Sequence, residues 1–148
     1  MQSSTPSYIH STLPCDVPLY VHELIAERLP ALTEHFKAND VDIGPLITPW
    51  LLTVFVIDTR THVMFRIWDA FLLEGVKVLI RVVLAIFTIH EQHLLTVTGS
   101  DDLFVRIKQL PGETTDGDEL MQVAFGLKKF KWQHIQQKRI TLFQQWSQ

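Results

Sequence analysis

The segment from Val76 to about Leu95 constrains the fold of this chain more than any other feature, because it is apolar on almost every side. Its polar residues form one narrow stripe, made of Lys77, Arg81, Thr88 and Gln92. A helix of this kind needs other helices around it. The apolar run at its start is too short to cross a membrane and carries two charges. We therefore expect the central helix of a bundle and no integral membrane segment.

Composition favours one globular domain in a reducing compartment. The chain has 148 residues, of which 47% are hydrophobic and 20% charged, enough for a single domain with a core. Its one cysteine, Cys15, cannot form an internal disulfide. No residue pattern around Cys15 suggests a reactive thiol. Residues 1–11 are polar and lack the apolar region of a secretory signal.

Helical periodicity continues on both sides of the central segment. Residues 17–36 are expected to be helical, with a break near Leu29 because Pro30 follows. Thr48 and Pro49 predict the start of a helix that runs to about residue 57. The next helix is expected over residues 61–73 and is closed by Gly75.

The apolar residues of these two helices recur at helical spacing and are expected to face the core. They are Trp50, Leu51, Val54 and Phe55 in the first helix, and Val63, Met64, Ile67, Trp68, Phe71 and Leu72 in the second. After the central helix, Ser100 is expected to cap a helix that ends near Pro111. Shorter helices are expected over residues 118–127 and 131–146.

These elements predict an all-α fold, a bundle of about six to eight helices. Residues 1–16 are rich in Ser, Thr and Pro and are expected to be a disordered lead-in. Residues 17–128 form the domain. Residues 129–148 are expected to form a basic amphipathic helix that packs on the same domain.

Charge is distributed unevenly along the chain. Residues 128–148 hold five of the 13 Lys and Arg residues and no acid, so this tail carries +5 and the remainder −8. Such a tail can mark an anionic partner. We favour a basic helix on an acidic body. The tail also contains Phe130 and Trp132, but we expect neither nucleic-acid nor membrane-surface binding.

The residues that could carry chemistry do not form a recognised site. His90 and His93 are three positions apart, whereas two histidines of a zinc-binding helix are four apart, and a third ligand is not evident. With 6 glycines and no phosphate-binding loop, a nucleotide pocket is not expected. We predict no catalytic residue, no metal site and no cofactor.

Three blocks in the middle of the chain resemble a known family. Pro49-Trp50-Leu51-Leu52-Thr53-Val54-Phe55 is followed by Arg66-Ile67-Trp68-Asp69 and by Glu74-Gly75-Val76-Lys77-Val78-Leu79. In order and spacing these residues resemble the C-terminal half of a TBC domain, the catalytic module of Rab GTPase-activating proteins. The similarity begins near Leu29 and weakens toward Ala124.

The resemblance implies a regulator of Rab-type small GTPases in vesicle traffic, which is not itself an enzyme. In that family an arginine of an Ile-x-x-Asp-x-x-Arg motif and a glutamine of a Tyr-x-Gln motif promote GTP hydrolysis, and neither motif occurs here. Asp58-Thr59-Arg60 is one residue short of the first motif, so Arg60 is expected to be a loop or first-turn residue. Arg66 is expected to pair with Asp69.

We therefore expect a fragment of a Rab GTPase-activating protein that is inactive alone. The alternatives are a non-catalytic helical module that binds a small GTPase or another protein, and an unrelated bundle. The resemblance also implies a cytoplasmic protein that could lie at the periphery of endomembranes. Surface left open by the missing half of the domain could cause self-association.

Overall fold

The computed structural model describes residues 17–127 together with residues 137, 140, 141 and 144. Over residues 17–127 the chain forms seven helices and no strand, which confirms the predicted all-α fold. They are α1 (Val17–Arg28), α2 (Pro30–Ala38), α3 (Gly44–Leu52), α4 (Thr61–Glu74), α5 (Val76–Thr96), α6 (Ser100–Glu113) and α7 (Gly117–Gly126). The expected lead-in and most of the expected last helix lie outside the described residues.

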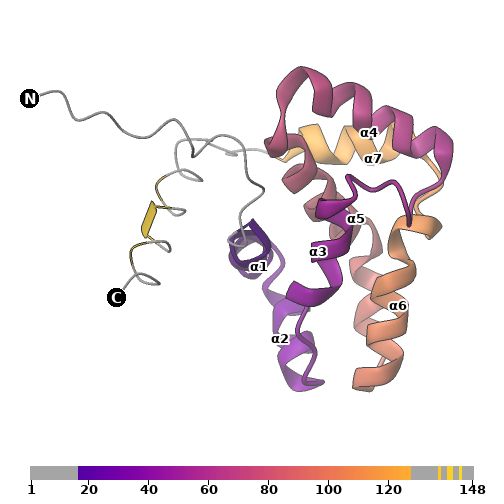
Figure 1. The fold of residues 1–148 in the computed structure, drawn as a ribbon. Coiled ribbons are helices and arrows are strands. Elements are labelled where there is room, and N and C mark those ends of the chain that lie inside the picture. The colour runs from indigo at the N-terminus through magenta and orange to yellow at the C-terminus, as the bar shows by residue number, and fades with distance from the viewer. Residues whose placement is uncertain (1–16, 128–136, 138–139, 142–143, 145–148) are drawn as a thin grey trace, which may run out of the picture.

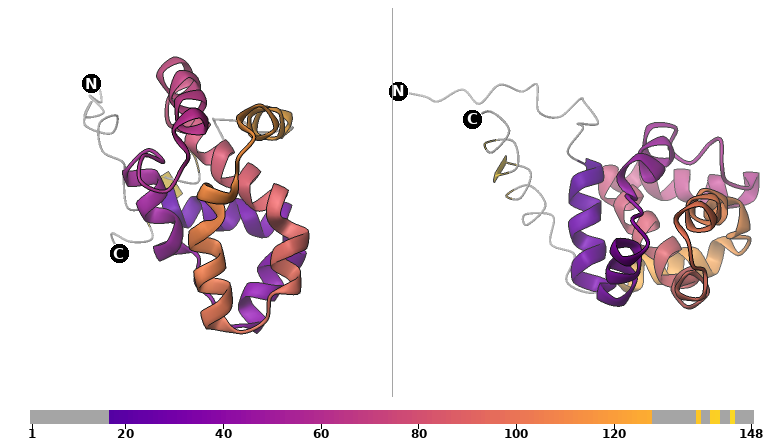
Figure 2. Two further views of the ribbon diagram at one scale, coloured as in Figure 1. Left: turned by 90° about the vertical axis from the view of Figure 1, so that its right-hand side faces the viewer. Right: turned by 90° about the horizontal axis from the view of Figure 1, so that it is seen from below.

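The centre of the molecule is α5, as its sequence predicts. It contacts α1, α2, α4, α6 and α7, and ten of its 21 residues are buried (Figures 1 and 2). The expectation that this segment is too short to cross a membrane is wrong, because the apolar helix continues to Thr96 and by length and composition α5 could cross one. The surrounding helices instead cover its apolar side chains, as in the core helix of a bundle.

Phe87 of α5 lies at the middle of an aromatic cluster that joins three helices. Its ring centroid is 6.1 Å from that of Phe36 in α2 and 6.0 Å from that of Trp50 in α3. Trp50 in turn contacts Phe55 at 6.3 Å. All four side chains are buried, so this cluster fixes α2 and α3 on the central helix.

The predicted break at Pro30 is confirmed. Helix α1 ends at Arg28, and Leu29 adopts a non-helical conformation before Pro30 begins α2. Proline is favoured at this position because its missing N–H would have no helical partner. The apolar residues that recur at helical spacing in this region are buried, and they are Leu24, Ile25, Leu29, Leu32 and Phe36.

The predicted bounds of the next helix are wrong at both ends. Helix α3 begins at Gly44, with Pro45 in its first turn and Asp42 Oδ1 accepting a hydrogen bond from the Gly44 N–H at 3.0 Å. Pro49 therefore lies inside the helix. Thr48 does not cap it, because Thr48 Oγ1 donates to the Gly44 carbonyl at 2.8 Å.

The early end of α3 has a clear physical cause. The Phe55 N–H donates to the Trp50 carbonyl at 2.8 Å and the Val54 N–H to the Leu51 carbonyl at 3.3 Å. These two bonds, with Val54 at φ 49°, form a Schellman motif. Glycine usually occupies the left-handed position of this motif. Because Val54 occupies that position here, the sequence does not indicate the motif. The buried contact between Trp50 and Phe55 completes the motif.

Two further boundaries test the predicted capping residues. Gly75 ends α4 at φ 79° and ψ −157°, a conformation open essentially to glycine alone, and this agrees with the prediction. The expected cap at Ser100 is wrong. Gly99 occupies the cap position of α6, Ser100 is the first helical residue, and α6 passes through Pro111 to end at Glu113.

Candidate functional site

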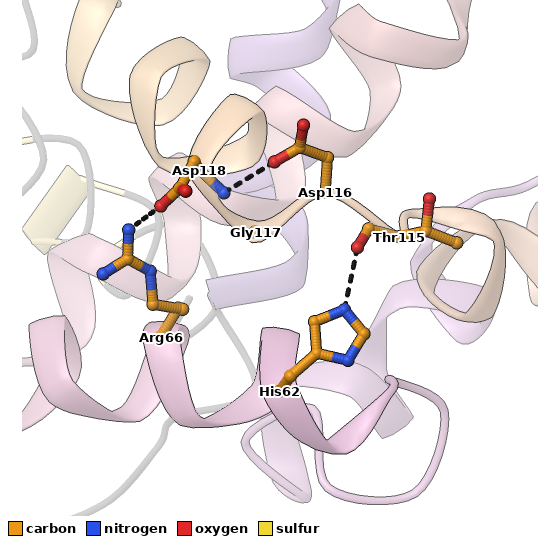
Figure 3. Close-up of a pocket in the computed structure, with 6 residues that line it drawn as sticks. All are labelled: His62, Arg66, Thr115, Asp116, Gly117 and Asp118. Carbon is orange, nitrogen blue, oxygen red and sulfur yellow. Dashed lines mark hydrogen bonds and ion pairs between the residues drawn. The ribbon is translucent and has the colours of Figure 1, made fainter.

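A surface depression lies between the start of α4 and the start of α7 (Figure 3). It has a volume of about 530 Å³ and is open to solvent. Its lining is polar and consists of His62, Arg66, Thr115, Asp116, Gly117 and Asp118. We call it the α4–α7 pocket.

One wall of this pocket is a hydrogen bond between α4 and the segment before α7. His62 Nε2 lies 2.8 Å from the Thr115 carbonyl oxygen. Since a carbonyl oxygen can only accept, Nε2 donates its proton here. Figure 3 shows the imidazole turned toward Thr115 and away from Arg66.

The second wall is an ion pair between Arg66 and Asp118. This pairing corrects the expectation that Arg66 would pair with Asp69 on its own helix. The first turn of α7 presents Asp118 directly to Arg66, and a carboxylate is favoured at a helix N-terminus. Both side chains are more than half exposed, so the pair contributes at most about 1 kcal/mol to stability.

The floor of the pocket is the N-terminal cap of α7. Asp116 Oδ1 accepts hydrogen bonds from the Asp118 and Glu119 N–H groups, both at 3.0 Å. Gly117 allows the close approach of the two helices, since a Cβ there would lie 3.3 Å from Cγ of Arg66. Asp116 and Glu119 have the spacing of a capping box, a signal that the sequence interpretation overlooked.

His62, Arg66, Asp116 and Asp118, four of the residues that line the α4–α7 pocket, each bind another group of the protein. The guanidinium of Arg66 binds an internal carboxylate, the carboxylate of Asp116 binds backbone N–H groups, and His62 binds a backbone carbonyl. Such an arrangement joins two helices. Within residues 17–127 no group of three or more His, Cys, Asp or Glu residues is placed to hold a metal ion.

The other arginine singled out by the sequence also has a structural role. Arg60 immediately precedes α4, and its Nε donates to the Gly112 carbonyl at 3.1 Å. It therefore ties the start of α4 to the last turn of α6. The lining of the α4–α7 pocket contains Arg66 but neither Arg60 nor a glutamine.

His90 and His93 have separate partners. His90 Nε2 lies 3.1 Å from Thr114 Oγ1, whereas His93 Nε2 accepts from Arg106 Nε at 2.8 Å. The pKa of His90 is lowered from its ordinary value of 6.5, chiefly because burial disfavours the charged ring. Glu113 opposes this shift, and the charges of His93 and Arg106 add to it.

The expectation that Trp68 faces the core is wrong. Its side chain is 37% exposed, and its Nε1 donates to the Val54 carbonyl at 2.9 Å. Leu72 is also exposed. The buried face of α4 carries Val63 and Ile67, as predicted, and Trp68 and Leu72 lie on the opposite side. Trp50 is buried at 2% exposure, in agreement with its expected packing role.

Arg81 has a structural role that the sequence interpretation did not predict. Its Nη1 donates to the Ala124 carbonyl at 3.2 Å and to the Leu127 carbonyl at 3.5 Å. These are carbonyls at the end of α7, which lack helical partners. Arg81 thereby attaches α7 to the central helix.

Cys15 and the basic residues of the tail lie outside the described part of the chain.

The described residues form an all-α scaffold. Polar groups at its surface, including those of the α4–α7 pocket, join its helices through hydrogen bonds and an ion pair. Comparison with known proteins then gives the family. The sequence model of the Rab-GTPase-TBC domain (RabGAP-TBC) matches residues 4–95. The chain therefore belongs to the TBC domain family of Rab GTPase-activating proteins, as its central blocks predict.

Individual relatives agree with this assignment. TBC1 domain family member 2B of Mus musculus is 34% identical over 118 residues, which cover 79% of this chain and 12% of the relative. TBC1 domain family member 2A of Homo sapiens is 30% identical over 122 residues, which cover 82% and 13%. The chain thus spans a small part of these curated relatives.

A solved structure shows the same fold. The flagellar RabGAP TBC domain of Chlamydomonas superposes with a TM-score of 0.70 and 36% sequence identity. The superposition covers 74% of this chain and 38% of that chain. The seven helices correspond to a portion of a TBC domain.

Proposed function

We propose that this chain supplies the scaffold part of a TBC domain that stimulates GTP hydrolysis by a Rab-type GTPase in vesicle traffic. The match of the TBC family model to residues 4–95 carries this proposal. The protein would act in the cytoplasm, at or near endomembranes, as a regulator of another protein's hydrolysis.

We further propose that the chain alone does not accelerate hydrolysis. The reaction needs an arginine that stabilises charge on the transferring phosphoryl group and a glutamine that orients the attacking water, and the sequence contains neither family motif. Arg60, which is one residue short of the first motif, is held by the Gly112 carbonyl, and Arg66 is held by Asp118.

Single-turnover GTP hydrolysis by a panel of purified Rab GTPases tests this proposal, with a complete TBC domain as positive control. Loss of an arginine finger costs roughly 10³–10⁵ in rate, so the 148-residue chain should leave the intrinsic rate unchanged. Acceleration that disappears in Arg60→Ala but persists in Arg66→Ala would show that Arg60 acts as the finger.

A non-catalytic binding module is the second candidate, and the exposed apolar side chains of α4 favour it. Such a module would bind a Rab protein without changing its hydrolysis rate. Biolayer interferometry against GTP-loaded and GDP-loaded Rab proteins separates the two candidates. Saturable binding with an unchanged rate supports the module, and absence of binding to every Rab opposes it.

A further inference from the structure

A short segment, Thr114-Thr115-Asp116, joins the end of α6 to the start of α7. We call it the α6–α7 linker. The backbone is extended on both sides of Thr115, since Thr114 has φ −75° and ψ 95° and Asp116 has φ −98° and ψ 101°. Thr115 itself is exposed. Exposed non-helical segments of this kind are the parts of a fold that another enzyme can most readily reach.

The hydroxyl of Thr115 is not used by the fold. His62 binds the backbone carbonyl of Thr115, and Figure 3 shows the side chain turned away from that contact. Among the residues that the structure describes, no group forms a hydrogen bond with Thr115 Oγ1. The neighbouring Thr114 differs, because it is 5% exposed and its hydroxyl donates to the Leu110 carbonyl at 2.9 Å.

Most other threonine hydroxyls of the described helices are engaged in the same way as that of Thr114. Each donates to a backbone carbonyl three or four residues earlier, a contact that holds the hydroxyl against its own helix. They belong to Thr33, Thr48, Thr53, Thr88 and Thr96. Thr59 Oγ1 is buried. Within residues 17–127, the exposed hydroxyls without such a contact are therefore those of Thr61, Thr98, Ser100 and Thr115.

The residues that follow Thr115 are acidic. Asp116, Asp118 and Glu119 stand one, three and four positions after it, and residues 109–127 contain no Lys or Arg. Protein kinases select substrates partly by charge pattern, and a basic substrate groove attracts an acidic segment. The surroundings of Thr115 therefore suit a kinase with a basic groove.

The other three exposed hydroxyls fit such a groove less well. Thr61 has no acidic residue in the four positions after it. Ser100 is the first residue of α6 and has acids at the first two positions only. Thr98 has acids at the third and fourth positions and is the nearest alternative. Thr115 alone combines an extended backbone on both sides with three acids in the next four positions.

We propose that Thr115 is a phosphorylation site for a protein kinase that recognises acidic residues after its target. In the reaction, Thr115 Oγ1 forms a bond to the γ-phosphorus of the Mg²⁺–ATP that the kinase holds. The bond from that phosphorus to the oxygen bridging the β- and γ-phosphates breaks, and ADP leaves. A carboxylate of the kinase accepts the hydroxyl proton.

The ion pair of Arg66 with Asp118 opposes this reaction. A kinase that reads the third position after Thr115 has to compete with Arg66 for the Asp118 carboxylate. Both side chains are more than half exposed, so the pair is weak enough to be displaced. Arg66 therefore slows the modification without preventing it.

Phosphorylation would change the charge of the α4–α7 pocket. Its charged lining is one guanidinium, that of Arg66, and two carboxylates, those of Asp116 and Asp118. A phosphothreonine adds about −1.5 to −2 charges at pH 7. The modification thus converts a nearly balanced surface into a strongly anionic one.

Phosphorylation of the full chain in vitro tests the site. The protein is incubated with Mg²⁺–ATP and a purified kinase that selects acidic residues after its target, and the phosphate is located by mass spectrometry of peptides. We expect a single phosphate on Thr115 and its loss in Thr115→Val. Thr98→Val is the matched control and should keep full incorporation. No phosphate at all, or a phosphate on another residue only, overturns the proposal.

The initial rate of incorporation tests the recognition. Asp116→Asn keeps a residue that can cap α7, and Glu119→Gln keeps the length of the side chain, yet each removes a carboxylate and should slow the reaction. Arg66→Gln should speed it, because Asp118 loses its competing partner. An unchanged rate in Arg66→Gln contradicts that competition, and unchanged rates in the two acidic variants contradict recognition by charge. These readouts are phosphate incorporation, so they are independent of the GTP hydrolysis that tests the proposed function.

Discussion

At the scale of single residues, backbone conformation explains where the helices stop. Gly75 and Val54 both have positive φ, at 79° and 49°. Glycine adopts this conformation without steric cost, whereas a β-branched residue does so only when its surroundings compensate. At Val54 the compensation is the buried pair of Trp50 and Phe55.

Substitution of Gly75 by Ala isolates the backbone cost. A Cβ at Gly75 would meet no atom within 4 Å, so the expected loss of about 1–3 kcal/mol in the free energy of unfolding comes from strain alone. Gly126 is the matched control, since it also has open space around it but no positive φ. Gly126→Ala should be neutral or slightly stabilising in urea unfolding, and equal effects at both sites would contradict this explanation.

At the scale of elements, the two helices that follow α5 begin in different ways. Helix α7 has an Asp116 side chain that satisfies two of its free N–H groups. Helix α6 has no side-chain cap, because Gly99 occupies the cap position. Asp101 and Asp102 instead support the first turn of α6 through the helix dipole.

Alanine substitution distinguishes these two starts. Asp116→Ala should lower the free energy of unfolding by about 1 kcal/mol, the typical value of a helix cap. Ser100→Ala should change it little, since Ser100 lies inside the helix. Chemical denaturation monitored by circular dichroism measures both, and a larger effect at Ser100 would show that the assigned caps are wrong.

At the scale of the whole molecule, α5 makes the described helices one unit. It contacts helices from both ends of the described chain, and its Phe87 joins α2 and α3 through aromatic contacts. Stability is therefore shared, and we expect residues 17–127 to unfold in one cooperative transition.

Truncation of the Phe87 side chain tests whether the described helices unfold as one cooperative unit. Phe87→Ala leaves a cavity between three helices and should cost about 3–5 kcal/mol. Far-ultraviolet circular dichroism and tryptophan fluorescence should shift to the same lower midpoint. Phe104→Ala, at a half-exposed position, should cost far less. Separate midpoints for the two probes would contradict a single cooperative unit.

The sequence predicts most of this fold because its strongest signals are local. Pro30 and Gly75 act through their own backbone sterics, and the apolar length of α5 identifies the core helix directly. The interpretation failed at Val54, where valine occupies a position typical of glycine. It failed again at Trp68, because a helix with two apolar faces does not reveal which one is covered.

The candidate site was less predictable than the fold, because most of its contacts join residues that are far apart in the sequence. Asp116 and Glu119 show the spacing of a capping box, so the start of α7 can be found from the sequence alone. The partners of Arg66 and His62 lie far along the chain, in α7 and the segment before it. Only the folded arrangement brings those side chains together.

The central position of α5 has a consequence for the synthesis of the protein. Helices α1 and α2 bury apolar side chains against α5, which ends at Thr96. Ribosomes add roughly 5–20 residues per second, so several seconds pass between the synthesis of α1 and α2 and the synthesis of α5, which covers their apolar side chains. During that interval the nascent chain exposes its future core, and chaperones would have their best opportunity to bind it.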